Sequence, residues 1–143
     1  AKDLQARIEA AGTQLPVRAA AALDEGFPVR AEALLRLCAE EFVGTATGDL
    51  AAQRLSKLER DKVARAARRA WTFFEKAVAD AERGRDKGRI LGNLDKAQAA
   101  SGAREVQEAY TALKDALFRE GPHALAAAWE GLQAAPSVEL ESV

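Results

Sequence analysis

The chain has 143 residues, enough for one ordinary domain with its own core, and 48% hydrophobic and 30% charged residues are typical of a folded globular protein. The formal net charge of -1 gives no overall attraction to nucleic acid or anionic lipid. No run of residues approaches the roughly 18 apolar positions of a membrane helix, and the sequence opens without the apolar stretch of a secretion signal. We therefore expect a cytoplasmic protein without membrane contact.

The charge is unevenly distributed along the chain. Residues 50–89 carry 12 basic and 6 acidic side chains, whereas residues 1–49 carry 5 and 8, and residues 105–143 carry 2 and 7. A basic middle is therefore flanked by acidic ends. Arg also outnumbers Lys by 14 to 7, a composition that favours a bacterial origin.

Short helices are predicted over residues 3–43, because apolar residues recur there at three- and four-residue steps and Gly or Pro interrupts the pattern. The first covers residues 3–11. The second begins near Pro16, a residue that suits a first helical turn, and ends at Gly26. The third begins at Pro28 and ends at Gly44.

A long helix is predicted over residues 50–83, a stretch without Gly or Pro, with Asp49 as its N-cap. At 1.5 Å per residue it would be about 50 Å long, longer than a compact domain of this size is wide. The glycines in "GRDKGRILGN" predict a loop, and further helices follow over residues 94–134. We expect one all-α domain over 1–135, a bundle of about five to seven helices built on the long amphipathic helix, with a flexible tail at 136–143.

The long helix carries a cationic face. On a helical wheel, most of its basic residues lie within about 80° of one direction, and apolar residues lie on the opposite half. Leu58 and Glu59 do not fit this pattern, since Leu58 lies among the cations and Glu59 lies among the apolar residues. The candidate nucleic-acid contacts on this face are Arg54, Lys57, Arg65, Arg68, Arg69 and Lys76.

The cationic face has three interpretations. A nucleic-acid backbone could lie along it, since each phosphate neutralised by Lys or Arg releases counterions. The face could equally be the solvated side of a bundle helix, because Lys and Arg side chains commonly cover apolar neighbours there. It could also dock onto an acidic protein surface, including the acidic C-terminal helices of this chain.

The apolar side of the long helix predicts a protein interface. A helix of this length leaves apolar surface that the short helices of the same chain do not cover, and such patches mark interfaces. We expect a homodimer in which the long helices pack together, with Trp71, Phe74 and Val78 at the contact. The favoured function is a non-catalytic interaction or regulatory module that also binds an unidentified protein partner. Nucleic-acid binding is the alternative.

No motif in the sequence predicts catalysis, a metal or a cofactor. His123 is the only histidine and follows Gly121-Pro122, where a capping or exposed role is usual. Cys38 is the only cysteine and lies on an apolar helical face, so we expect a core residue rather than a nucleophile. The Glu-x-x-His pattern of di-iron bundles and the glycine patterns of phosphate-binding loops are both missing.

Overall fold

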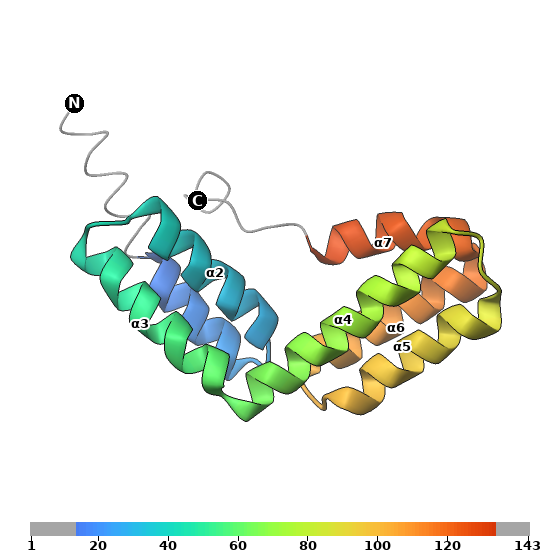
Figure 1. Ribbon diagram of the computed structural model, residues 1–143, viewed down its shortest axis with the longest axis horizontal. Coiled ribbons are helices and arrows are strands. Elements are labelled where there is room, and N and C mark those ends of the chain that lie inside the picture. Colours follow the sequence, from blue (N-terminus) through green and yellow to red (C-terminus); the bar gives the residue numbers. More distant parts are fainter. Residues whose placement is uncertain (1–13, 134–143) are drawn as a thin grey trace. The chain divides into compact units, whose positions relative to one another are not determined.

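The computed structural model describes residues 14–133, which form helices and no β-strand (Figure 1). The all-α helical bundle class is therefore confirmed. The predicted helix at 3–11 and the tail at 136–143 lie outside the described residues. Within the described part of the chain, no helix combines the length and the apolar character needed to cross a bilayer.

Contacts between residues divide the chain into two compact units. Among the described residues, unit 1 comprises 14–61 and unit 2 comprises 62–133. Each is described by itself, and the single domain expected over 1–135 stays a prediction.

Unit 1 consists of a helix at residues 14–24, α2 (Pro28–Glu41) and α3 (Ala46–Arg60) (Figure 1). Gly26 turns the chain between the first two helices with a positive φ of 89°, which L side chains rarely adopt. Pro28 then opens α2 in its first turn, where its missing N–H costs nothing. The fully buried side chains of this core include Leu15, Ala31, Leu34, Leu35, Cys38 and Ala51.

Thr45, and not Asp49, caps α3. Its Oγ1 accepts a hydrogen bond from the backbone N–H of Gly48 at 3.1 Å and donates one to the Phe42 carbonyl at 2.6 Å. Thr is among the residues favoured at this position, because its side-chain oxygen pairs with an otherwise unpaired N–H. Asp49 lies in the first turn of α3, where a negative charge is also favourable.

The predicted continuous helix over 50–83 is wrong: it is two helices, α3 and α4 (Lys62–Glu82). Asp61 between them has extended backbone angles, φ -71° and ψ 132°, a geometry typical of an N-cap, which Asp favours. Leu58 is buried in unit 1 and Ala64 in unit 2. Leu58 and the fully buried Phe74 of α4 lie sixteen residues apart, about 160° around a single helix, so one apolar stripe would not run through both.

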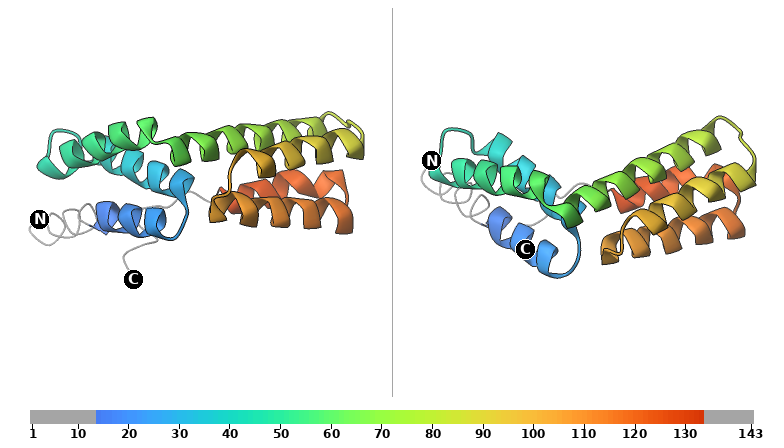
Figure 2. Two further views of the ribbon diagram at one scale, coloured as in Figure 1. Left: turned by 90° about the horizontal axis from the view of Figure 1, so that it is seen from below. Right: turned by 60° about the horizontal axis from the view of Figure 1, so that its bottom comes forward.

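Unit 2 is a helical bundle of α4, α5 (Lys87–Ala100), α6 (Arg104–Arg119) and α7 (Leu125–Leu132), with a 3-10 turn η1 (Pro122–Ala124) before α7. In two views α5 runs back along α4, α6 runs beside α5, and α7 lies beside α4 and α6 (Figure 2). Its core is built from Ala67, Phe74, Ala77, Ile90, Leu94, Val106, Leu113, Leu117 and Leu125, each fully buried.

The glycine-rich stretch predicted as a loop is largely helical. Asp86 caps α5, because its Oδ1 accepts the backbone N–H of Arg89 at 2.8 Å. Gly88 and Gly92 therefore lie inside a helix, each at a cost of about 1 kcal/mol relative to Ala. Burial of Ile90 and Leu94, both 0% exposed, offsets that cost at about 2 kcal/mol for each side chain.

Replacing Gly48 and replacing Gly92 by alanine should change the stability of the fold in opposite directions. A Cβ at Gly48 would overlap the Phe42 carbonyl oxygen and lie 2.7 Å from the Phe42 carbonyl carbon, whereas one at Gly92 would meet nothing within 4 Å. We expect Gly48→Ala to destabilise the fold by about 2–3 kcal/mol, and Gly92→Ala to stabilise it by about 0.5–1 kcal/mol. Urea unfolding followed by far-UV circular dichroism measures both; equal midpoints would contradict the predicted turn geometry.

Candidate functional site

The residues predicted to form a protein interface lie in the core of unit 2. Phe74 is 0% exposed and Val78 is 7% exposed, while Trp71 is half-buried. Trp129 of α7 packs against two of the three aromatic residues of α4, with its ring centroid 5.0 Å from that of Trp71 and 5.8 Å from that of Phe74. The apolar surface expected to need a partner is therefore covered by α7 of the same unit.

The predicted cationic set is divided between the two units. Arg54 and Lys57 belong to α3 of unit 1. The other four lie on α4 of unit 2, where Arg65, Arg69 and Lys76 share a face. Arg68 is half-buried and lies outside that face.

A basic groove runs between α4 and α5 in unit 2. It comprises two adjoining open hollows of about 710 Å³ and about 580 Å³, and Lys96 lines both. The first is lined by Lys62, Arg65, Ala66, Arg69, Phe73, Lys96, Ala99 and Ala100. The second is lined by Lys76, Ala79, Asp80, Arg83, Arg89, Gly92, Asn93 and Lys96.

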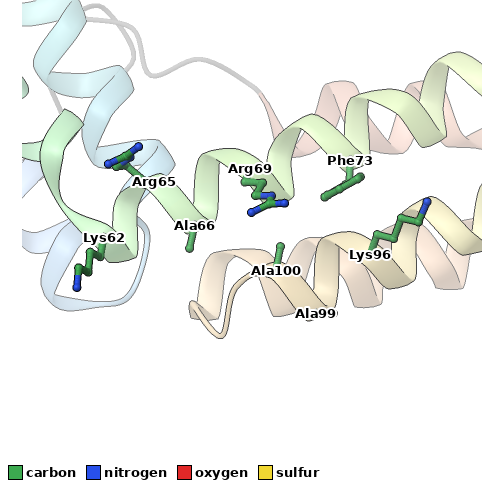
Figure 3. A pocket seen from close by; sticks show the side chains of 8 residues that line it. All are labelled: Lys62, Arg65, Ala66, Arg69, Phe73, Lys96, Ala99 and Ala100. Atoms are coloured by element: carbon green, nitrogen blue, oxygen red, sulfur yellow. The ribbon is translucent and has the colours of Figure 1, made fainter.

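Helical spacing produces the two walls of the basic groove. Its residues on α4 recur at three- and four-residue steps from Lys62 to Arg83, and those on α5 do so from Arg89 to Ala100, so each set forms one stripe. At 1.5 Å per residue the stripe on α4 is about 30 Å long. In the close view, Arg69 points from α4 into the space between the two helices and Lys96 reaches into it from α5 (Figure 3).

Small residues form much of the floor of the groove. Ala66 on α4 and Ala99 and Ala100 on α5 line the first hollow, and their short side chains take up little of the space between the helices (Figure 3). Ala79 and Gly92 line the second hollow in the same way. A chain-like ligand could therefore approach the helix backbones closely between the cationic side chains.

Positive charge dominates the groove. Seven of its lining residues are exposed cations: Lys62, Arg65, Arg69, Lys76, Arg83, Arg89 and Lys96. Within residues 14–133, none of Lys62, Arg65, Arg69 and Lys96 forms an ion pair with an acidic side chain. Their charges are thus available to an external anion.

Asp80 is the one acidic residue in the groove lining, and its charge is compensated. It is only 6% exposed, and its Oδ2 accepts a hydrogen bond from Asn93 Nδ2 at 2.8 Å. Arg89 Nε lies 3.5 Å from the same oxygen. The carboxylate therefore ties α5 to α4 and orients two side chains of the second hollow, while it presents little negative charge to solvent.

The contribution of α5 to this site is not predicted by the sequence. Arg89 and Lys96 lie seven residues apart, two helical turns, and so share a face once α5 begins at Lys87. The glycines predict a loop over residues 84–93, which includes Arg89, whereas Lys96 falls in the helices predicted over 94–134, so the sequence does not place the two cations on one helical face. The capping residue Asp86, three positions before Arg89, was the signal that could have placed them.

The described residues offer no group of three or more His, Cys, Asp or Glu side chains able to hold a metal ion. His123 is exposed in η1. Cys38 is 0% exposed, with its Sγ 4.0 Å from the Thr47 carbonyl oxygen. Burial disfavours the thiolate and raises the pKa of the Cys38 thiol above its ordinary value of 9.0.

None of the family models, curated proteins or solved structures compared with the chain matches it. The function therefore has to be argued from the groove itself.

Burial of Cys38 predicts a slow reaction with thiol reagents. Because the reactive species is the thiolate, and the Cys38 thiol is both inaccessible and raised in pKa, we expect the folded protein to react at least about 100-fold more slowly with a disulfide reagent at pH 8 than the urea-unfolded chain does. The raised pKa also makes stability fall as pH rises above 9.0, since the unfolded thiol loses its proton first. Rapid labelling of the folded protein would contradict the predicted core position.

Proposed function

We propose that unit 2 binds nucleic acid by seating a phosphate backbone in the basic groove. The observation that carries this proposal is the row of seven exposed cations along about 30 Å of groove, with a single, compensated acid among them. Arg guanidinium groups match phosphate geometry with two parallel donors, and four of the seven are Arg. This was the alternative function indicated by the sequence, and α5 now contributes to it.

The shape and lining of the groove favour nucleic acid over an acidic protein surface. Protein interfaces depend on a few buried aromatic or aliphatic anchors at their centre. The basic groove offers alanines, a glycine and one phenylalanine, Phe73, but no apolar pocket of that kind. A phosphate backbone needs only a track of cations with room between them, which this lining supplies.

The chain as a whole is slightly acidic, so the attraction is local. Residues 62–100 carry ten basic and five acidic side chains, whereas residues 101–133 carry three and five. Charges more than about 8–10 Å apart are screened from each other at physiological salt, so a ligand in the groove responds mainly to the groove cations. Binding should depend steeply on salt. A cytoplasmic location is part of this proposal, because nucleic acid is present there.

Removing two groove cations tests the proposal. If about six phosphates are neutralised, the affinity for a labelled single-stranded oligonucleotide falls with salt at a log–log slope of about -4. We expect Arg69→Ala/Lys96→Ala to weaken binding by at least about tenfold at low salt and to reduce that slope by about 1–2. Fluorescence anisotropy across a salt series measures both quantities.

The matched control is Arg104→Ala/Arg119→Ala, which removes the same charge from exposed positions of α6 that do not line the groove. It should bind like the parent protein. Arg54→Ala/Lys57→Ala tests the other half of the predicted cationic set, in unit 1, and should also leave binding unchanged. No binding at low salt, or equal losses in all three double variants, would overturn the proposal.

A second candidate function, protein interaction through unit 1, is favoured by an apolar hollow there. The hollow measures about 420 Å³ and lies between the helix at 14–24, α2 and α3. Its apolar lining is Pro16, Ala19, Ala20, Leu23, Leu35 and Leu58. Leu23 remains 41% exposed, so a partner or a second copy of the chain could add to this surface. The interaction or regulatory module indicated by the sequence would then bind its partner through this hollow, and not through Trp71, Phe74 and Val78.

Sedimentation tests self-association through this hollow. If a second copy covers it, the parent protein sediments as a dimer at micromolar concentration and Leu23→Glu, which adds a charge at the hollow, sediments as a monomer. Val43→Glu is the matched control, since Val43 is 79% exposed and does not line the hollow. A parent protein that remains monomeric at high micromolar concentration would reject the homodimer.

A further inference from the structure

Phe73 holds an unusual position within the basic groove. It is the one aromatic residue among the lining residues of the two hollows, and it is half-buried. Its ring points from α4 toward the space between the helices, and Lys96 of α5 lines the same hollow (Figure 3). Arg69 and Lys76 flank it four residues before and three residues after on the same stripe of α4. An aromatic ring is thus placed among three cations inside the groove.

The neighbouring aromatic residues have structural roles that Phe73 does not share. Trp71 and Phe74 pack edge to face, with centroids 5.6 Å apart, and both contact Trp129 of α7. Phe73 makes no ring–ring contact among the described residues; its ring partner there is the Lys76 ammonium group, 5.2 Å from the ring centroid. Phe73 is half-buried and lines the hollow, so a planar ligand would stack on the part of the ring that remains exposed.

Cations that follow a backbone, combined with an accessible aromatic ring, are the two parts of a site for single-stranded nucleic acid, and Phe73 is partly accessible. A base can stack on the ring while phosphates on either side meet the flanking cations. A duplex offers no such contact, because its bases are already stacked and paired. The same groove would bind a duplex through phosphates alone.

We propose that the basic groove selects single-stranded nucleic acid by stacking a base on Phe73, with Arg69, Lys76 and Lys96 holding the adjacent phosphates. This inference rests on the proposed function, since it assumes that a nucleic-acid backbone lies in the groove. It adds that part of the affinity comes from the bases, and that Phe73 is the residue that provides it.

Two oligonucleotides of equal charge separate the two contributions. One is a labelled oligothymidylate of about 12 nucleotides. Even at a stacked spacing of about 3.4 Å per nucleotide, this strand is longer than the groove, which is about 30 Å long. The other has the same length and label but carries abasic sites in place of the bases. We expect the full-length parent protein to bind the oligothymidylate about tenfold more tightly than the abasic strand, because stacking on an aromatic side chain is worth roughly that factor per base.

Phe73→Leu should abolish this difference. Leucine keeps an apolar side chain on α4 but removes the aromatic face, so the variant should bind both strands with the affinity that the parent protein has for the abasic strand. The matched control is Phe118→Leu on α6. Phe118 is 52% exposed and also has a lysine over its ring, Lys87 at 4.3 Å, but it does not line the groove.

The outcomes distinguish this inference from the function on which it rests. Equal binding of the two strands by the parent protein would overturn stacking and leave phosphate binding intact. Loss of the base-dependent difference in Phe118→Leu, but not in Phe73→Leu, would place the stacking site elsewhere and overturn the role of Phe73. If neither strand binds at low salt, the proposed function itself fails. Circular dichroism of each variant establishes that it is folded.

Discussion

The change of helical phase between Leu58 and Phe74 is the constraint on which the other features depend. A single amphipathic helix would keep its apolar stripe on one side from α3 through α4, but these two buried positions lie about 160° apart. Asp61, with its extended backbone, separates the two helices. The apolar residues of α3 therefore pack in the core of unit 1, and those of α4 pack in the core of unit 2.

Once α4 is independent of α3, its apolar face is short enough to be covered within unit 2. Alanines at positions such as Ala67, Ala70 and Ala77 are fully buried and allow α4 to pack closely against its neighbours. Trp129 of α7 then packs against Trp71 and Phe74 of α4. The same packing of α4 against α5 leaves their cationic stripes side by side on the solvent side. The basic groove is thus a by-product of how the apolar faces are buried.

The sequence was sufficient for the fold class and for most helix positions, because Gly and Pro boundaries and three- to four-residue periodicity report local structure directly. It failed where two local signals competed. The break at Asp61 was not predicted, because residues 50–83 contain no Gly or Pro. The position of Leu58 among the cations already indicated that the apolar face of the helix changes direction. The first two turns of α5 were predicted as a loop because they contain glycines. In the structure, the capping by Asp86 and the burial of Ile90 outweigh the cost of those glycines. The cationic residues of α4 could be found from sequence, whereas their pairing with Lys96 required the helices to be placed together.

The aromatic cluster of unit 2 also determines what can be observed optically. Both tryptophans of the chain, Trp71 and Trp129, and its only tyrosine, Tyr110, lie in unit 2. Intrinsic fluorescence therefore reports on that unit alone, and melting of unit 1 leaves the emission unchanged as long as the indole environment persists. The indole rings are 5.0 Å apart, close enough for their electronic transitions to couple. Emission consequently follows unit 2 alone, whereas backbone ellipticity follows the helices of both units, and a mismatch between their transitions would reveal that the two units melt separately.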